Sequence, residues 1–438
     1  MGLISDASIR YRPGRLITST EIHMIGRLRI GFAAALLALS SVSVTAITID
    51  VTRFDDPAGT ATPAGVSLRQ AVLLANSTPG PDTITLHAGT YALTLRGNDA
   101  TAAAGDLDIT DAVTIEGDPL GGTDVDARKA RDRVFEVLAS GALTLRHVAV
   151  QHGHAAGDGG GILSVGTLTV ENCIFTDNKA RVSGGAIASE GGTCTLTDVV
   201  VTNNKALTDD GGGCEFDVAG SATLTRVTID DNRAKDTGGG VDTNDGVTVA
   251  LVDCTVSNNR SRREGGGLDP SGGTLTLTNT TVSGNHSAKG GGIQLEDAGV
   301  VVLDHVTIAH NTARQGAGLW IEPGSTTTLT ATLLAKNTPR DCLGAIVSNG
   351  SNLIGRGDGC TITGDPTGNI VGSGRRPQRP VDPRIGPLDD NGGPTRTHAL
   401  LGGSPAIDAV AGTCPPPAAD QRGLPRIAPC DIGAFEVQ

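Results

Sequence analysis

Three carboxylate residues recur at a fixed spacing of 27 residues along the middle of the chain: Glu215, Asp242 and Asp269. Each comes directly after a glycine-rich segment, so the three occupy the same place in a repeated unit. If the chain coils with that period, neighbouring carboxylates lie ~4.8 Å apart, the spacing of adjacent strands in a sheet. Anions this close repel unless a proton or a cation lies between them, so we expect raised pKa values or bound Ca²⁺.

Further residues at and beside this repeat position extend the acidic column. It continues into Gln294 and Trp320, the only tryptophan, while Asp210 and Glu264 directly precede the glycines and flank the column. An acidic strip beside one aromatic ring suits a sugar polymer, because the carboxylates or Ca²⁺ handle charge while the ring stacks on a sugar. The alternative is an ordinary solvated acidic face.

The same column would supply the catalytic groups of an enzyme. A glycosidase needs two carboxyl groups ~5.5 Å or ~6.5–9.5 Å apart, and Glu215, Asp242 and Asp269 would offer either separation on neighbouring or alternate turns. Because many such pairs exist, the spacing selects none of them. A lyase would also need a basic residue beside the acids. By position, the basic candidates are Lys289, Arg262 and Arg263.

The composition limits the core and the partners. Of 438 residues, 62 are Gly and 21 are Pro, and the aromatic residues are six Phe, two Tyr and one Trp. A core of this size must therefore be aliphatic. The net charge of −13 and the scarcity of stacking side chains argue against nucleic acid as the main partner.

Two markers repeat in phase through the middle of the chain. The first is a glycine-rich tetrad whose starts lie 25 to 27 residues apart, at 159–162, 184–187, 211–214, 238–241, 265–268, 290–293 and 316–319. The second is an aliphatic residue or Phe three positions before an Asn; these asparagines are Asn178, Asn204, Asn232, Asn259, Asn285, Asn311 and Asn337. One period held by two markers predicts a structural unit stacked on itself.

Within each unit the hydrophobic period is two. Segments such as 167–170 and 274–278 alternate Thr with aliphatic residues, which is typical of short strands with one buried face. Three such strands per unit predict a right-handed single-stranded parallel β-helix of about ten turns. The helical half of leucine-rich repeats is missing, and the strict period gives no reason for the hairpins of a sandwich. We expect the asparagines to hydrogen-bond from turn to turn.

Residues 24–46 have the features of a secretory signal, within an N-terminal extension spanning 1–46. Arg27 and Arg29 precede the apolar run 30–39, and small residues at 44–46 fit a cleavage site. The run is too short to span a bilayer, which needs ~20 residues, so we expect an exported protein without a transmembrane span. Export allows disulfides. The expected bridges, in loop-rich sequence, are Cys342–Cys360 and Cys414–Cys430, and the cysteines expected to be buried and free are Cys173, Cys194, Cys214 and Cys254.

The ends of the coil are expected to be capped, because a solenoid otherwise exposes its last strands. Ser67 and Gln70 form a capping-box pattern that opens an apolar helix at 68–76. After residue 337 the period is lost and Pro, Gly and Cys become frequent, which predicts a disulfide-stapled C-terminal cap. The expected parts are a cap helix with irregular turns at 47–150, regular repeats at 151–337 and a C-terminal cap at 338–438.

Three sets of motifs resemble known protein families. The segments Phe175-Thr176-Asp177-Asn178 and Gly184-Gly185-Ala186-Ile187 resemble the FxxN and GGAI repeats of polymorphic outer membrane proteins, although the other turns carry an aliphatic residue for Phe. Residues 66–71 are similar to the N-terminal motif of CSLREA-domain proteins, with Val66 for Cys and Gln70 for Glu. The segments that resemble the choice-of-anchor Q domain are 382–395, 403–408, 420–423 and 430–436.

The resemblance covers most of residues 60–438 and implies an exported bacterial β-helix protein, often attached to the cell surface. We therefore expect a secreted or cell-surface protein, with outer-membrane association as one form. The leading hypothesis is a non-catalytic adhesive or polysaccharide-binding protein whose partner is a polysaccharide or a cell-surface glycan. The alternative is a polysaccharide lyase or glycoside hydrolase that uses the acidic column, with Ca²⁺ as its candidate cofactor. The residues that would then bind the polymer are Asp210, Glu264, Gln294 and Trp320.

Overall fold

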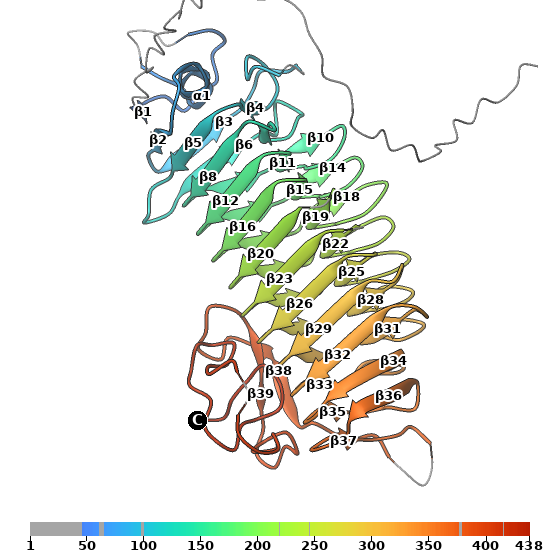
Figure 1. The fold of residues 1–438 in the computed structure, drawn as a ribbon. Helices are drawn as coiled ribbons and strands as arrows, with labels where there is room; N and C mark the ends of the chain where they lie inside the picture. The colour runs from blue at the N-terminus through green and yellow to red at the C-terminus, as the bar shows by residue number, and fades with distance from the viewer. Residues whose placement is uncertain are drawn as a thin grey trace, which may run out of the picture. The chain divides into compact units, whose positions relative to one another are not determined.

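The computed structural model describes residues 46–60, 65–97, 100–218, 220–244, 246–375, 379–414 and 416–438. These residues form one compact unit, an all-β right-handed parallel β-helix in which the single described helix has ten residues. Successive strands stack along the coil (Figure 1), which confirms the fold predicted from the repeat period. Apart from Ala46, the predicted signal segment lies outside the described residues.

The first ladder of parallel strands comes from the segments that alternate Thr with aliphatic residues. In β26, for example, Leu275 and Leu277 are buried in the core while the threonines between and beside them are half-buried. The first ladder consists of β1 (Thr48–Val51), β2 (Asp82–Leu86), β5 (Ala112–Glu116), β8 (Ala142–Arg146), β12 (Thr167–Glu171), β16 (Thr193–Thr197), β20 (Ser221–Thr225), β23 (Thr248–Val252), β26 (Thr274–Thr278), β29 (Val300–Asp304), β32 (Thr326–Thr330), β34 (Cys342–Asn349) and β36 (Cys360–Asp365).

The second ladder is formed by short strands, and in the regular turns each of them ends just before the repeated Asn. The second ladder consists of β3 (Gly89–Ala92), β6 (Thr123–Asp126), β9 (Ala149–Gln151), β13 (Ile174–Thr176), β17 (Val200–Thr202), β21 (Thr228–Asp230), β24 (Thr255–Ser257), β27 (Thr281–Ser283), β30 (Thr307–Ala309), β33 (Leu333–Ala335), β35 (Leu353–Ile354) and β37 (Ile370–Val371). Three shorter strands pair with one another: β10 (His154–Ala155), β14 (Lys179–Ala180) and β18 (Lys205–Ala206). β14 and β18 each follow a marker asparagine, and β10 has the equivalent place one turn earlier, after Gly153.

The third ladder follows the glycine-rich tetrads and carries the acidic column. Its strands are β4 (Leu107–Ile109), β7 (Phe135–Val137), β11 (Ile162–Ser164), β15 (Ile187–Glu190), β19 (Cys214–Asp217), β22 (Val241–Thr243), β25 (Leu268–Pro270), β28 (Ile293–Leu295) and β31 (Leu319–Ile321). Among the described residues, the turns that contribute a strand to this ladder number about nine, close to the expected length of about ten.

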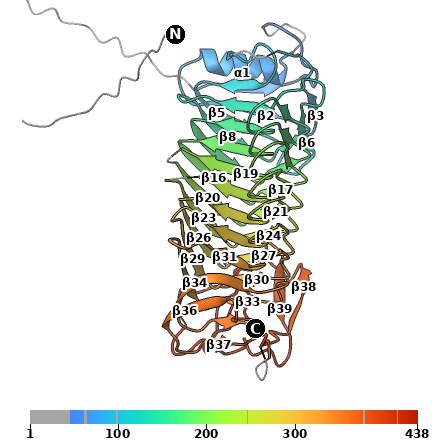
Figure 2. The same cartoon turned by 90° about the vertical axis from the view of Figure 1, so that its right-hand side faces the viewer.

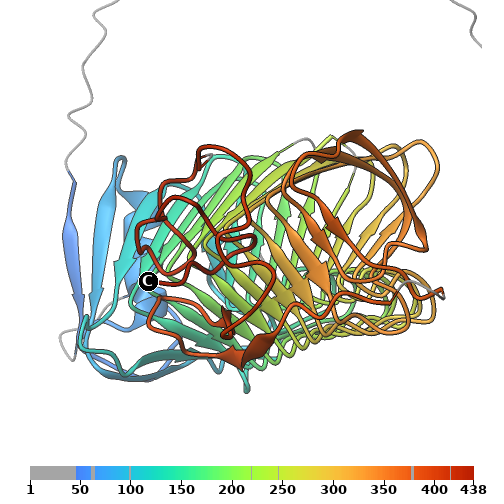
Figure 3. The same cartoon turned by 90° about the horizontal axis from the view of Figure 1, so that it is seen from below.

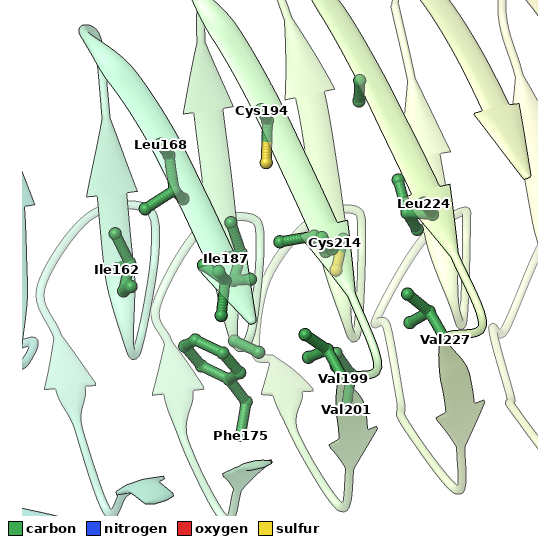
Figure 4. Close-up of a cluster of buried hydrophobic side chains, with 14 of the residues drawn as sticks. Ile162, Leu168, Phe175, Ile187, Cys194, Val199, Val201, Cys214, Leu224 and Val227 are labelled. Atoms are coloured by element: carbon green, nitrogen blue, oxygen red, sulfur yellow. The ribbon is translucent and has the colours of Figure 1, made fainter. Parts of the chain in front are cut away.

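The three ladders enclose an aliphatic core. Figure 4 shows Leu168, Ile187 and Val201, which come one from each ladder, among the side chains that fill the interior of the coil. Cysteines take part in this packing as small apolar residues, since burial raises the pKa of the Cys194 thiol to about 12. The free and buried cysteines are Cys173, Cys194, Cys214 and Cys254, as expected.

The repeated asparagines form one buried column, which confirms the expected bonding from turn to turn. Both the backbone N–H and the side-chain Nδ2 of Asn178 donate to Oδ1 of Asn204 at 3.0 Å, and Nδ2 also donates to the carbonyl oxygen of Val150. The pattern continues to Asn337, whose N–H and Nδ2 donate to Oδ1 of Asp341 instead of another asparagine. The column therefore satisfies the polar groups of a sharp bend in every turn.

The helix α1 (Leu68–Ser77) lies at the N-terminal end of the coil, beside β2 and β5 (Figure 2). The predicted capping box is present, because Ser67 accepts from the N–H of Gln70 and the Gln70 side chain accepts from the N–H of Ser67. Arg69 is fully buried, forms an ion pair with Asp56 at 2.6 Å and donates to the carbonyl oxygen of Ala102. The helix is thus fixed to the first turns by a buried charge pair as well as by its apolar face.

The C-terminal part differs from the expected cap that begins at residue 338. The strands β34, β35, β36 and β37 continue the coil to Val371, because aliphatic positions and an inward Asn recur there without the glycine markers. Both expected disulfides are present, with Cα–Cα distances of 5.7 Å for Cys342–Cys360 and 5.5 Å for Cys414–Cys430. Within the described residues, no helix is long and apolar enough to cross a membrane.

The remaining residues, 379–438, fold back along the outer face of the second ladder (Figure 3). They include the antiparallel pair β38 (Ile385–Asp389) and β39 (Thr397–Leu400). Gln421 is fully buried: its Nε2 donates to the carbonyl oxygen of Cys254, and its Oε1 accepts from the hydroxyl of Thr281 at 2.6 Å. The C-terminal segment therefore covers the side of the coil as well as its end.

Candidate functional site

The predicted acidic column exists as a register of neighbouring strands. Glu215 in β19 pairs with Asp242 in β22, which pairs with Asp269 in β25. The next turn brings Gln294 into the same line, since Leu268 pairs with Ile293 just before it, and Gln294 pairs with Trp320. The side chains of these residues point away from the apolar core, as the alternation of a strand requires.

The expectation that this column is open to solvent is wrong. Asp242 is 2% exposed, Asp269 is 1% exposed and Gln294 is fully buried, while Glu215 is 9% exposed. An acid that acts on a polymer must reach the scissile bond. The column is therefore an internal layer of carboxyl groups beneath the surface of the coil, and it does not form the acidic cleft expected from the sequence.

The loop that enters each strand of the third ladder covers the column. The first glycine of each tetrad has a positive φ, +53° at Gly265, and lies so close to the acid four residues later that a Cβ atom there would be 2.4 Å from the Cβ of Asp269. Only glycine fits such an approach. The hydroxyl oxygen of Thr237, just before the preceding tetrad, lies within hydrogen-bond distance of both Asp210 and Asp242, at 2.9 Å and 2.8 Å.

Burial and mutual repulsion raise the pKa values along the column. Burial raises the pKa of Glu215 to about 9, with the charge of Asp242 adding to the shift. Burial likewise raises the pKa of Asp242 and of Asp269 well above the ordinary range, and the charges of Asp210 and of Asp242, respectively, contribute. These directions agree with the expectation drawn from the stacking of like charges.

A second row of acids lies above the column, and one lysine partly balances it. Lys289 Nζ is 2.7 Å from Glu264 Oε1, and it also lies 4.6 Å from the ring centre of Trp320. Although burial works against it, the hydrogen bond from Lys289 lowers the pKa of Glu264. Because the ammonium group occupies one side of its ring, Trp320 is a poorer stacking platform for a sugar than the sequence led us to expect.

Among the residues that the structure describes, two groups of three carboxylates have oxygen atoms within 4.8 Å of one another: Asp209 with Asp210 and Asp236, and Asp106 with Asp108 and Glu136. Both groups contact an arginine. Arg263 lies 2.9 Å from Asp236, and Arg133 pairs with Asp106 at 3.1 Å. Arginine reduces the need for a metal ion at these two places. Arg262, the other basic candidate, belongs to a different surface.

That surface is a row of basic residues that the sequence analysis missed. The residues directly after the asparagines pair from one turn to the next. Lys179 pairs with Lys205, and Lys205 pairs with Arg233. The same register continues through Arg260 to His286. Two positions further on, beyond a buried Ala or Ser, a second outward position is basic in several turns. We call these residues the basic strip: His154, Lys179, Lys205, Arg233, Arg260 and His286 in the inner row, and Arg181, Lys235, Arg262 and Arg314 in the outer row.

The basic strip is open to solvent and carries little countercharge. All of its side chains are exposed except Lys205, which is half-buried. Within the described part of the chain, Arg233 is the one member with an acidic side chain within 4 Å, Asp231 at 3.4 Å. Two hollows lie along it, one of about 510 Å³ lined by His154 and Arg181 and one of about 310 Å³ lined by Arg260 and Arg314. A row of exposed basic side chains with little countercharge, beside shallow hollows, can bind a chain of anions.

The signal for the basic strip was present in the sequence. Five of the seven marker asparagines are followed by Lys, Arg or His, and in five of the seven turns the residue three positions after the Asn is Lys or Arg. The asparagines predict hydrogen bonds at the corners of the coil, but they do not by themselves predict that the residues after them point to solvent. For the acidic column, the prediction that its side chains point away from the core is confirmed. The loop that covers these side chains was not predicted.

A family model described as the right-handed beta helix region matches residues 134–285 and 192–371. The chain therefore belongs to the right-handed β-helix family. Among solved structures, the crystal structure of pectate lyase Pel9A is similar, with a TM-score of 0.46 and 13% sequence identity over 90% of this chain and 98% of that chain. No curated protein sequence matches the chain significantly.

Proposed function

We propose that this protein binds a linear anionic polysaccharide along the basic strip and does not cleave it. The observation that carries the proposal is the strip's register, which places a cationic or titratable side chain on each of six consecutive turns ~4.8 Å apart. Such an array fits a polymer with regularly repeated anions. A small ligand would instead require a concave and largely apolar pocket.

The chemistry of the strip favours carboxylate or sulfate groups on a sugar chain. Arginine and lysine bind such anions through charge-assisted hydrogen bonds. The strip contains no aromatic residue on which a nucleic-acid base could stack. The net charge of −13 also repels a polyanion everywhere except at the strip, which would hold the polymer in one orientation.

The burial of the acidic column supports a non-catalytic role. A glycoside hydrolase needs two carboxyl groups that flank the scissile bond, whereas Asp242 and Asp269 lie beneath a loop. The lyase alternative needs a base beside the acids, and Lys289 is engaged with Glu264. We therefore assign Glu215, Asp242 and Asp269 no catalytic part.

Affinity electrophoresis in gels containing polygalacturonate or alginate tests this function, with neutral dextran as the control polymer. We expect retardation by the anionic polymers alone, weakening as salt is added. The double variant Lys205→Glu/Arg260→Glu should bind at least about tenfold more weakly, which corresponds to ~1.4 kcal/mol of binding free energy. The matched control, Arg96→Glu/Arg384→Glu, changes charge equally at exposed positions outside the strip and should bind normally.

Three outcomes would contradict the proposal. Equal loss of binding in the control variant would reduce the effect to net charge. Single-stranded DNA bound as tightly as the polysaccharides would favour a nucleic-acid partner. Unsaturated or reducing sugar ends released from either polymer, with or without Ca²⁺, would show that the protein is an enzyme.

We also infer that the protein is exported and acts outside the cell or at its surface. The signal pattern at 24–46 and two disulfides support this inference. The segments 382–395, 403–408, 420–423 and 430–436 resemble the choice-of-anchor Q domain, and other segments resemble polymorphic outer membrane and CSLREA-domain proteins. These resemblances support attachment to the cell surface. Mass spectrometry of the extracellular fraction should find a chain that begins after the signal. A full-length chain that stays in the cytoplasm with reduced cysteines would contradict the inference.

A further inference from the structure

Asp269 occupies the centre of the buried acidic column. Both of its carboxylate oxygens are buried and lack a hydrogen-bond partner within the described structure. Its side chain has Asp242 on the turn before and Gln294 on the turn after. Leaving an isolated carboxylate buried costs several kcal/mol, so a proton or a cation must accompany it.

Gln294 provides an independent indication of whether a proton or a cation accompanies Asp269. Its Nε2 donates to Glu264 at 2.8 Å and to Glu296 at 3.0 Å, which fixes the orientation of the amide. The other end of the amide, Oε1, is buried without a partner. Gln294 is fully buried, and it follows Ile293, which pairs with Leu268 just before Asp269. Its carbonyl oxygen is therefore an unused buried acceptor on the turn next to that of the carboxylate.

The two residues together present three unpartnered acceptor oxygens and no free donor, because both N–H groups of Gln294 are already used. One proton on Asp269, donated to Oε1 of Gln294, would satisfy two of these oxygens and leave the other carboxyl oxygen without a partner. A cation bound by both oxygens of Asp269 and by Oε1 of Gln294 serves all three, and Asp242 on the preceding turn supplies a further carboxylate. The surrounding acids Asp210, Glu264 and Glu296 add negative potential, and of these three Lys289 pairs with Glu264.

We propose that Asp242, Asp269 and Gln294 form a buried binding site for Ca²⁺. The ligands are all oxygen atoms, which excludes a preference for thiolate- or imidazole-binding metals. Ca²⁺ accepts a bidentate carboxylate and a flexible ligand set, whereas Mg²⁺ demands nearly ideal octahedral geometry. The site is separate from the basic strip, and it stands whether or not the protein binds a polysaccharide.

The single tryptophan gives the site its own spectroscopic readout. Trp320 pairs with Gln294 on the next turn, so a lanthanide in the site lies close to the indole. Tb³⁺ is chemically similar to Ca²⁺ and emits when a nearby indole transfers energy to it. Excitation at the red edge of the absorption, where tyrosine does not absorb, should give Tb³⁺ emission that Ca²⁺ abolishes by competition.

The test uses the mature chain after treatment with a chelator, titrated with Ca²⁺ by calorimetry and with Tb³⁺ by luminescence. We expect about one Ca²⁺ per chain, tighter binding as the pH rises and release of protons on binding, because the ligands must be deprotonated. Asp269→Asn should remove both Ca²⁺ binding and the Tb³⁺ signal. It should also raise the Tm of the metal-free protein, since it removes an unbalanced buried charge.

Two control variants keep the test decisive. Asp209→Asn removes a carboxylate from the half-buried group near Arg263 and should leave the Tb³⁺ signal unchanged, as should the exposed Asp389→Asn. Loss of binding in Asp209→Asn but not in Asp269→Asn would overturn the assignment. So would the absence of bound Ca²⁺ in the wild type above neutral pH, which would mean that protons alone neutralise the column.

Discussion

The side-chain Nδ2 of Asn204 donates a hydrogen bond to Oδ1 of Asn232, 28 residues later, at 3.0 Å. The backbone N–H of Asn204 donates to the same oxygen at 3.0 Å. One amide oxygen thus accepts two bonds from the preceding turn, while its own nitrogen donates to the next asparagine and to the carbonyl oxygen of Val201. Each asparagine therefore connects three turns.

Asn232→Ala should destabilise the coil strongly, because it leaves buried groups of the preceding turn, the N–H of Asn204 and the carbonyl oxygen of Val201, without their partner. We expect a loss of about 3 kcal/mol or more in the free energy of unfolding, since each orphaned buried group costs ~1–3 kcal/mol. Denaturant unfolding followed by circular dichroism measures it. Asn349→Ala, at an exposed position with one side-chain bond to Thr330, serves as the control, and an equal shift in both variants would refute the role of the column.

Gly265→Ala should be costly for a different reason. The new Cβ would lie 2.4 Å from the Cβ of Asp269, and the φ of +53° is unfavourable for alanine. We expect a loss of about 2 kcal/mol or more and weaker Ca²⁺ binding. At Gly402 a Cβ would meet no atom within 4 Å, so Gly402→Ala should be neutral. If both variants unfold at the same denaturant concentration, the close approach of the loop is not required.

The stability of the metal-free protein should fall as the pH rises. Burial raises the pKa of Glu215 from 4.5 to about 9, so the folded chain keeps a proton that the unfolded chain loses above pH ~4.5. Stability is then lost progressively as the pH rises from about 4.5 to about 9. Between pH 5 and pH 8 this one group contributes a decrease of up to ~4 kcal/mol.

Thermal unfolding in a chelator, recorded across this pH range, provides the measurement. Glu215→Gln keeps the shape of the side chain without its charge, so it should flatten the decline and raise the Tm at pH 8. Asp389→Asn, on the exposed surface, should follow the wild type. A wild-type Tm that rises steadily up to pH 8 would contradict the predicted direction.

The docking of residues 379–438 depends on Gln421. Its side chain bonds to Cys254, Thr281 and Thr395 at once, and burial leaves no water to replace those contacts. Gln421→Ala should therefore release the segment and make it sensitive to limited proteolysis while the coil stays resistant. Gln438→Ala, with an exposed side chain, should be cut no faster than the wild type. Unchanged cleavage in Gln421→Ala would show that apolar contacts alone hold the segment.

Much of the fold could be predicted from the sequence because a solenoid repeats one set of local rules. The Asn and Gly markers fix the register, and the register alone places Glu215 beside Asp242 and Asn178 beside Asn204. The alternation in Thr274–Thr278 fixes which side chains enter the core. Both disulfides followed from their position after the last regular repeat.

The remaining features depend on contacts that no period encodes. Whether Asp269 is buried depends on the path of the loop before Gly265, and that loop has no strand pattern. The return of residues 379–438 along the second ladder depends on single long-range bonds such as that from Gln421 to Cys254. The basic strip follows the period, but it was visible only after the register had identified the outward side chain beside each asparagine.

The asparagine column ends at Asp341, and every interior asparagine has the same kind of neighbour on both sides. Excision or duplication of one whole unit would consequently rejoin equivalent partners, with no orphaned amide and no change of face. Unequal recombination within such a gene can thus lengthen or shorten the protein one unit at a time. Where the unit carries a basic residue after its Asn, each such event would add or remove one member of the basic strip and so change the length of polymer that the protein contacts.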